Sequence, residues 1–386
     1  MKKRFLRDIA EIQTGPFGSQ LHKEDYVDVG TPIVTVEHLG SRMFSEQNLP
    51  MVSEADKSRL SKYVLKKGDI VFSRVGSVDR CSFVDQKHDG WMFSGRCLRV
   101  RPNEEVDSLF LYYFFCLNAT KEFVRSIAVG ATMPSINTKL LGEVEVICPE
   151  IEEQRKIADI LSKIDDKIEE NQKINENLEQ QALALFNNFY DQSNTEVNFT
   201  DLIQILGGGT PKTGESMYWN GNIPFFTPKD VGTPYTLVTE KTITEDGLSH
   251  CNSRLYPVNT VFVTARGTVG KIGLAGVPMA MNQSCYALVG KNLNQLLVYF
   301  YALKAVDRLK HKASGAVFDA IITRDFETEQ IFKLSEDDTN TFIKIVEPMY
   351  QLILNNSVEN QRLIALKNSL LPKLMSGEVD LSAIQI

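Results

Sequence analysis

The stretch "IADILSKIDDKIEENQKINENLEQQALAL", from Ile157 to Leu185, decides the fold. Its apolar side chains recur at alternating intervals of four and three residues, which is the heptad seam of a helix that packs along another helix. Two asparagines interrupt the seam at its centre. The seam positions are Ile157, Leu161, Ile164, Ile168, Asn171, Asn175, Leu178, Ala182 and Leu185.

The same seam occurs a second time near the C-terminus, and both asparagines recur in register. Its positions are Phe342, Val346, Met349, Ile353, Asn356, Asn360, Leu363, Lys367 and Leu370. Two seams in one chain most simply pack on each other, and a twofold relation between repeats makes the pair antiparallel. Central asparagines cost stability but fix the register of such a pair. The alternative is two solvated helices that each lie on their own domain.

Two prolines bear on the second helix. Pro348 predicts either a kink or the true start of the helix, and Pro372 predicts its end, because proline lacks a backbone N–H and its ring crowds the preceding turn. Asp165 and Asp166 lie on the first helix and are interpreted as solvated charges.

The globular segments before the two helices repeat the same order of features. "LKKGDIVFSRVGSV" (Leu65–Val78) resembles "LYPVNTVFVTARGTV" (Leu255–Val269), and each leads to a small-residue turn. Each turn is followed by a strand-like stretch, an aromatic-rich helix and a loop, "AVGATMPSIN" (Ala128–Asn137) or "ASGAVFDAII" (Ala313–Ile322). Internal repeats of this kind predict two copies of one unit, each a globular domain followed by a long helix.

Composition limits the class of protein. The net charge of −7 belongs to the two helical segments, and the globular segments are nearly balanced. The longest apolar run, Leu109–Leu117, is too short to span a bilayer, and the N-terminus lacks a signal-peptide core. Six cysteines without a C-x-x-C pair indicate free thiols in a reducing cytoplasm, and the five histidines form no metal-binding pair. We therefore expect a cytoplasmic protein without a membrane segment or metal site.

The glycine-rich stretch "GGGTPKTGES" (Gly207–Ser216) resembles a phosphate-binding loop only in part. Glu215 occupies the position where that loop carries its lysine, so nucleotide binding is not expected. The sequence also lacks an adenine-methyltransferase motif, a nucleophile elbow and any nucleophile–base set. These observations argue against an enzyme. We expect the first glycines to permit a tight turn and a close backbone approach.

Several motifs together resemble the specificity (S) subunits of type I restriction-modification systems. "GGGTPKTGESMYWNGNIPFFTPKDVG" (Gly207–Gly232) resembles the opening of a target-recognition domain, and "ARGTVGKIG" (Ala265–Gly273) matches a further element of that domain. "PEIEEQRKIADILSKIDDKI" (Pro149–Ile168) and "LLPKLMSGEVDL" (Leu370–Leu381) resemble the family's central and C-terminal regions. The resemblance covers the whole chain, although the stretch "QTGPFGSQL" and the second helix match less well.

This resemblance implies an α/β (α+β) twofold repeat, with two target-recognition domains and a pair of long antiparallel coiled-coil helices. The expected segments are 1–148, 149–190, 191–335 and 336–386. Each domain would read half of a bipartite, asymmetric double-stranded DNA target, and the helix pair would set the spacer between the halves. The expected partners are two modification (methyltransferase) subunits and restriction (translocase and nuclease) subunits. Those partners would bind S-adenosylmethionine, ATP and magnesium, so no cofactor is expected in this chain.

Polar and basic residues around the small-residue loops are the predicted DNA contacts, because such side chains pair with base edges and phosphates. In the first domain they are Thr14, Ser19, Lys23, Arg74, Ser77, Arg80, Thr132 and Ser135. In the second they are Thr210, Lys212, Thr213, Lys229, Arg266, Thr268, Lys271 and Lys312. Two alternative functions remain open at this point, a recognition module of a related restriction system that is not type I, and a non-catalytic coiled-coil interaction or adhesion protein.

Overall fold

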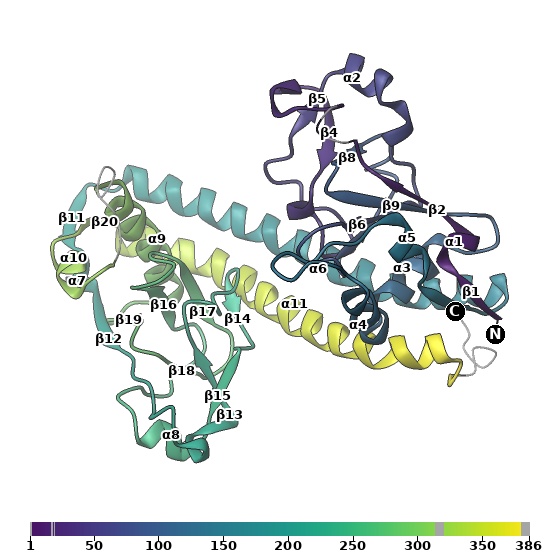
Figure 1. Cartoon of the computed structure of the whole chain (residues 1–386). Helices are drawn as coiled ribbons and strands as arrows, with labels where there is room; N and C mark the ends of the chain where they lie inside the picture. Colours follow the sequence, from purple (N-terminus) through teal and green to yellow (C-terminus); the bar gives the residue numbers. More distant parts are fainter. Residues whose placement is uncertain (1, 17, 19, 313–319, 380–386) are drawn as a thin grey trace. The chain divides into compact units, whose positions relative to one another are not determined.

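The computed structural model describes residues 2–16, 18, 20–312 and 320–379, and the chain divides into two compact units. The first unit comprises Met1–Ile168 with Leu363–Ile386, and the second comprises Glu169–Arg362. Two long helices, α6 (Ile151–Gln192) and α11 (Glu336–Ser376), contribute residues to both units (Figure 1). Residues 313–319 of the second predicted loop lie outside the described residues, as do Ser19 and the end of the C-terminal motif.

Besides the strand pair β1–β10, the first unit contains two small sheets. One is antiparallel with the order β2-β9-β6-β7, and the other has the order β3-β5-β4-β8. The strands are β1 (Lys2–Phe5), β2 (Ala10–Thr14), β3 (Tyr26–Val27), β4 (Thr31–Val34), β5 (Met51–Val52), β6 (Ile70–Ser73), β7 (Cys81–Phe83), β8 (Met92–Phe93), β9 (Cys97–Pro102) and β10 (Glu145–Cys148). The helices are α1 (Leu6–Ile9), α2 (Glu54–Arg59), α3 (Ser108–Cys116), α4 (Asn118–Ser126) and α5 (Thr138–Gly142).

The aromatic-rich segment of the first unit is helical, as predicted, and forms the core on one face of the β2-β9-β6-β7 sheet. Asp107 caps α3 by accepting hydrogen bonds from the backbone of Leu109 and Phe110. Phe115 of α3 packs edge-to-face on Phe72 of β6, with ring centroids 4.6 Å apart. The helix therefore holds β6, and the turn that follows β6, in a fixed position.

The second unit repeats this plan. One sheet has the order β12-β19-β16-β17-β14 and the other β15-β13-β18, and α9 (Gln295–Lys312) takes the place of α3 and α4. The strands are β11 (Thr195–Asn198), β12 (Ile203–Gly207), β13 (Trp219–Phe226), β14 (Tyr235–Thr236), β15 (Lys241–Ile243), β16 (Val261–Thr264), β17 (Ile272–Ala275), β18 (Ala280–Met281), β19 (Cys285–Gly290) and β20 (Gln330–Lys333). The shorter helices are α7 (Phe199–Leu202), α8 (Glu245–Ser249) and α10 (Thr323–Glu327). The predicted two-copy α/β organisation is confirmed.

Each globular part is closed by a two-strand neck. In the first unit β1 pairs antiparallel with β10, with Lys2 opposite Cys148. In the second unit β11 pairs with β20 in the same way, with Thr195 opposite Lys333. The chain thus enters and leaves each globular part at adjacent strands.

The antiparallel helix pair predicted from the two seams is confirmed. Within the second unit, Asn356 of α11 donates a hydrogen bond to Asn175 of α6 over 2.9 Å. Asn171 donates to Asn360, also over 2.9 Å. The four amides are buried, and rising numbers on one helix meet falling numbers on the other. The side-chain amides thus satisfy each other across the seam, which fixes the register of the two helices.

Within the first unit the seam contains a buried charged contact, and the interpretation of Asp165 as a solvated charge was wrong. Asp165 is only 5% exposed. It accepts hydrogen bonds from Lys367 of α11 at 2.6 Å and from the Tyr113 hydroxyl of α3 at 2.8 Å. Asp166 is exposed but pairs with Arg42 at 2.5 Å. The partners lie far away in the sequence, so the heptad pattern alone could not identify them.

Pro348 does not mark the start of the second helix and Pro372 does not end it, so both of these predictions were wrong, while the kink at Pro348 stays a prediction. The helix α11 starts at Glu336, before Pro348, and continues past Pro372 to Ser376. Leu371, Leu374 and Met375 are buried in the core of the first unit. Burying them stabilises the last turn enough to offset the one backbone hydrogen bond that Pro372 cannot donate.

Candidate nucleic-acid interface

A tight turn at the same place in each unit is the centre of the candidate site. In the first unit it connects β6 to β7, and in the second it connects β16 to β17. Gly76 and Gly267 occupy equivalent positions, with φ angles of 74° and 83°. Positive φ is accessible to glycine at little cost, which explains why both copies carry it at this position.

Equivalent backbone hydrogen bonds close the two turns. The Ser73 amide donates to the Arg80 carbonyl and the Thr264 amide to the Lys271 carbonyl, each over 2.9 Å. Arg80 and Lys271 are therefore equivalent residues, and both are exposed. The framework is common to the two copies, while the side chains it carries differ.

The loop after the aromatic helix is attached to the turn in both units. The Ile136 amide donates to the Arg74 carbonyl, and the Ile321 amide donates to the Ala265 carbonyl, each over 2.9 Å. Single β-bridges join Val75 to Ser135 and Arg266 to Ala320. Segments far apart in the sequence thus meet at the turn by the same pairing in each copy.

A pocket lies beside each turn. In the first unit its volume is about 500 Å³, and it is lined by Gly76, Ser77, Val78, Asp79, Arg80, Arg125 and Pro134. In the second its volume is about 480 Å³, and it is lined by Thr227, Pro228, Lys229, Glu240, Lys241, Arg266, Gly267, Thr268, Asn282 and Ser284. The structure therefore brings together Ser77 with Arg80, and Lys229 with Arg266 and Thr268, from the predicted set.

Sequence reasoning missed several residues of these pockets. Arg125 of α4 pairs with Asp79 at 2.9 Å, and Lys241 of β15 lies with its ammonium 5.7 Å from the ring centre of Trp219. Asn282 and Ser284 supply further amide and hydroxyl groups. In the repeat alignment Ser284 stands opposite Arg96, which does not line the first pocket, so the alignment does not identify it. Arg125 meets Asp79 only when α4 packs beside the turn.

The loops after β2 and β12 approach the sheet closely at glycine. A Cβ at Gly15 would overlap the Ser94 carbonyl oxygen, and a Cβ at Gly208 would overlap that of Asn282. The expected close backbone approach of the first glycines is thus confirmed at Gly208. Thr14 is half-buried at the end of β2, and Thr210 donates a hydrogen bond to Gln283.

The remaining predicted residues divide into exposed and engaged groups. Lys212, Thr213 and Thr132 are exposed, and the Lys212 carbonyl accepts a hydrogen bond from the Trp219 indole over 3.2 Å. Arg74 donates to the Gly95 carbonyl and Ser135 to the Val129 carbonyl, so both help to hold loops. Lys229 is largely exposed and lies 3.8 Å from Glu240. Lys23 lies in a short 3₁₀ turn, and nothing further is described of its side chain.

Lys312 differs from the others because it pairs with Glu329, whose side chain is only 1% exposed. Arg308 also lies 4.0 Å from the same carboxylate. A cation that neutralises a buried carboxylate is held by the fold, so a structural role competes with the predicted DNA contact at this position.

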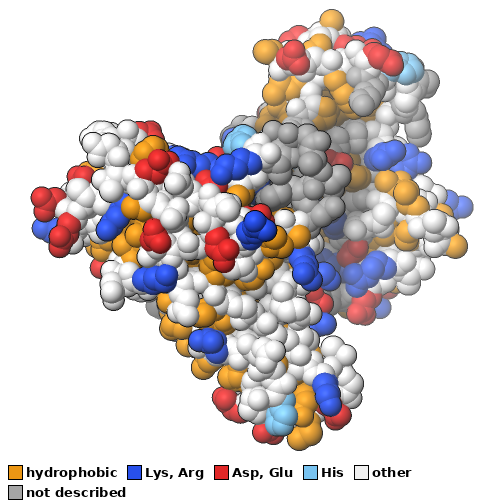
Figure 2. Space-filling model, turned by 90° about the vertical axis from the view of Figure 1, so that its left-hand side faces the viewer, with side chains coloured by type: hydrophobic (Ala, Val, Ile, Leu, Met, Phe, Trp, Pro, Cys, Tyr) orange, Lys and Arg blue, Asp and Glu red, His pale blue; other side chains and the backbone are white. Residues whose placement is uncertain are grey.

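The surface charge is mixed. Figure 2 shows Lys and Arg side chains interspersed with Asp and Glu side chains over the face in view.

Two cysteines lie beneath the turns. Cys97 and Cys285 begin the equivalent strands β9 and β19, and both are fully buried. Burial raises the pKa of each thiol to about 12, so both stay neutral and serve as packing residues under the turns.

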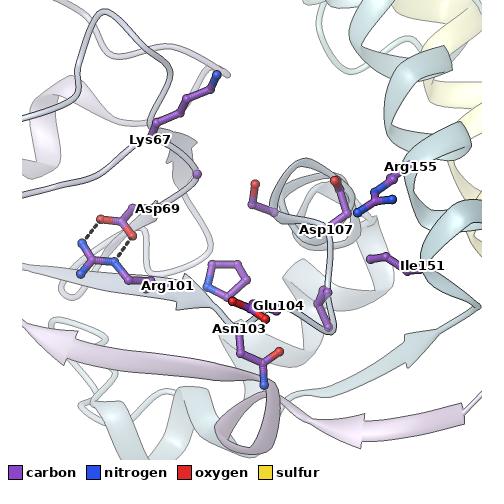
Figure 3. Close-up of a pocket in the computed structure, with 12 residues that line it drawn as sticks. Lys67, Asp69, Arg101, Asn103, Glu104, Asp107, Ile151 and Arg155 are labelled. Carbon is purple, nitrogen blue, oxygen red and sulfur yellow. Dashed lines mark hydrogen bonds and ion pairs between the residues drawn. The ribbon is translucent and has the colours of Figure 1, made fainter.

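A separate pocket of about 300 Å³ lies in the first unit where the β9–α3 loop faces α6 (Figure 3). Arg101 and Asp69 point toward each other on one wall of this pocket. The Arg101 guanidinium donates two hydrogen bonds to the Asp69 carboxylate, over 2.6 and 2.7 Å. The Asp107 amide donates to Gln154 of α6. Arg101 and Asp69 satisfy each other within the globular part, and the Asp107–Gln154 hydrogen bond connects that part to α6, so these groups have structural roles. Among the residues that the structure describes, no group of three or more His, Cys, Asp or Glu side chains could hold a metal ion.

The similarity to known proteins follows this geometry. Residues 1–180 and 192–368 match the family "Type I restriction modification DNA specificity domain". These residues make up most of the chain, and the chain belongs to this family. The match also sets aside the coiled-coil adhesion protein considered as an alternative.

Within the described ranges, no helix has the length and hydropathy needed to cross a bilayer.

The similar proteins include two curated type I specificity subunits. The MjaIX specificity subunit of Methanocaldococcus jannaschii is 24% identical, covering 97% of this chain and 92% of its own length. The HindI specificity subunit of Haemophilus influenzae is also 24% identical, covering 83% and 88%. The solved type I S subunit from M. genitalium has a TM-score of 0.63 at 16% identity, covering 97% of this chain and 95% of that chain, which supports the fold.

Proposed function

We propose that each globular domain reads one half of a bipartite, asymmetric DNA target through the surface centred on its β6–β7 or β16–β17 turn. The observation that carries this proposal is the repetition of one framework with different side chains. Both turns have the same glycine and the same backbone hydrogen bonds, yet Val75 and Asp79 of the first turn stand where the second has Arg266 and Gly270. The second pocket also includes Lys229. A common framework with different polar groups suits two domains that read different short sequences.

The chemistry of these side chains suits base edges and phosphates. Arginine and lysine pair with guanine or with phosphate, whereas serine, threonine and asparagine reach other base edges in the major groove. Glycine at the turn lets the backbone approach the duplex closely. The exposed Lys212 and Thr213 would extend this surface in the second domain.

The long helices would set the spacer between the half-sites and dock partner subunits. At 1.5 Å per residue, α6 with 42 residues is about 63 Å long, and its register with α11 is fixed by the paired asparagines. Two modification subunits would bind S-adenosylmethionine and methylate adenine, and restriction subunits would use ATP and magnesium. The chain itself would carry no cofactor and no catalytic group, and it would act in the cytoplasm, where its cysteines stay reduced.

The experiment that tests this function is methylome sequencing of cells that express the chain together with modification subunits. We expect a new split motif with two defined halves, an undefined spacer of constant length, and adenine methylation on both strands. A continuous palindromic motif, or the absence of any new motif with a complex that assembles normally, would contradict the proposal.

A further inference from the structure

The loop between α4 and α5 of the first unit forms a rigid hairpin, which we define as residues 129–135. The Val129 and Ser135 backbones exchange hydrogen bonds of 2.9 and 2.8 Å, and Ser135 Oγ also donates to the Val129 carbonyl. Gly130 has a φ of 107°, and a Cβ there would lie 2.6 Å from the Met133 carbonyl oxygen. The hairpin therefore closes tightly at a glycine that other residues could not replace.

This hairpin is fixed to the turn of the candidate site through its C-terminal side. The Gly76 amide donates to the Pro134 carbonyl over 2.8 Å, and the Ile136 amide donates to the Arg74 carbonyl over 2.9 Å. Pro134 lines the same pocket as Ser77, Arg80 and Arg125. The residues at the tip thus border the predicted DNA surface and are held in place before any ligand binds.

The hairpin exposes apolar side chains next to a pocket that also contains Ser77, Arg80 and Arg125. Met133 is 63% exposed and Val129 54% exposed, although the described part of the unit has large buried cores for such residues. In the major groove, the thymine 5-methyl group is the apolar feature of the base edges, and apolar side chains recognise it by contact. A methionine is long and unbranched enough to reach into a groove and adapt to a methyl group.

We propose that Met133 is a specificity-determining residue of the first domain and that it recognises a thymine by contact with its 5-methyl group. The inference rests on the proposed DNA-reading function and adds a base type to it. The neighbouring arginines would neutralise phosphates, while the rigid hairpin places the thioether at one base-pair position. Preorganisation matters here because a mobile loop would lose its conformational freedom on binding.

The test uses the complex of this chain with its modification subunits and a duplex that carries the motif found by methylome sequencing. Each thymine of the first half-site is replaced, one at a time, by deoxyuridine, which lacks only the 5-methyl group. We expect one position at which this change weakens binding about fourfold, the value for one methyl-sized apolar group. Met133→Ala should weaken binding to the thymine duplex and bind both duplexes equally, whereas Met133→Leu should keep most of the discrimination.

The matched control is Val258→Ala, which changes an exposed apolar residue of the second unit. This variant should discriminate thymine from deoxyuridine in the first half-site as the original chain does. The inference is overturned if Met133→Ala discriminates thymine from deoxyuridine as the original chain does. A first half-site that is insensitive to every methyl group, or that contains no thymine on either strand, overturns it as well. In all these cases the complex still binds its motif, so the result is distinct from failure of the proposed function, in which no motif is bound.

Discussion

Arg266 is an exposed cation at the rim of the second pocket, next to the glycine that shapes the turn. Replacing it with alanine removes a group that could donate two parallel hydrogen bonds to guanine or phosphate. We expect Arg266→Ala to weaken binding to the second half-site by about 10- to 100-fold, corresponding to the range for one good bidentate contact.

The measurement is a binding titration with duplexes that carry either half-site in a scrambled form. Lys333→Ala removes an exposed cation from the neck strand β20 and should leave affinity nearly unchanged. Equal affinity and equal adenine methylation for Arg266→Ala and the original chain would remove Arg266 from the interface.

At the scale of residues, the sequence predicts positions near the repeated turns better than positions whose partners are distant. Ser77, Arg80 and Arg266 lie beside the repeated turns, where both copies place small residues next to cations, and their contact with DNA stays a prediction. The pairing of Lys312 with the buried Glu329 could not be predicted, because that carboxylate becomes a neighbour only when α9 folds against the segment before β20. Arg125 was missed for the same physical reason.

At the scale of elements, the buried contact of Asp165 with Lys367 and Tyr113 joins α6, α11 and α3. Lys367→Met should destabilise the chain by about 2 kcal/mol, because it leaves a buried carboxylate with only the tyrosine hydroxyl as a partner. The double variant Asp165→Leu, Lys367→Met should recover most of this loss, since replacing both members of a buried pair is often neutral.

Chemical denaturation followed by circular dichroism measures both variants. Lys373→Met changes an exposed lysine on the same helix and should leave the free energy of unfolding nearly unchanged. If Lys367→Met were as stable as this control, the contact would contribute nothing to holding the helices together.

Glu179 of α6 gives the helix pair a dependence on pH in the second unit. Burial, with a smaller contribution from Glu176, raises its pKa above the ordinary 4.5, although the Tyr299 hydroxyl partly opposes this. A raised carboxylate pKa means that folding disfavours the charged form. The ionised carboxylate therefore destabilises the fold at any pH above the pKa of the folded state, and this destabilisation disappears below the pKa of the unfolded state.

Glu179→Gln should therefore be more stable than the original chain at pH 7, and the difference should shrink toward zero as the pH falls through the raised pKa. Denaturation midpoints between pH 4 and 7 provide the measurement, with the exposed Glu347→Gln on α11 as the control. A difference that stays constant across this range would show that the carboxylate is not penalised by burial.

The helices show why elements with a strong periodic pattern are the most predictable part of the fold. The heptad seam predicts both their existence and their pairing, since the apolar stripe must be buried. Their limits were less predictable, because α11 passes Pro372 where Leu374 and Met375 pack into the core of the first unit. Tertiary packing at that point outweighs the local preference of proline.

At the scale of the whole chain, the net charge is −7 and the basic residues of the globular parts are offset by acids. Affinity for duplex DNA depends largely on phosphate neutralisation, which a balanced surface supplies only locally. We expect the isolated chain to bind its target with a dissociation constant in the micromolar range or weaker at physiological salt.

Fluorescence anisotropy with the isolated chain and with the complete complex provides the comparison. Modification subunits that enclose the duplex should tighten binding by several orders of magnitude. Nanomolar affinity of the isolated chain under the same conditions would contradict the expectation.

The paired strands at each neck have a consequence for inheritance. Because β1 lies against β10 and β11 against β20, the chain between them begins and ends at one short ladder. A genetic exchange with crossovers in these strands would replace a whole globular part while leaving both long helices intact. Recombination between related genes could thus create a new combination of half-sites in a single event, with no need for the two halves to adapt to each other.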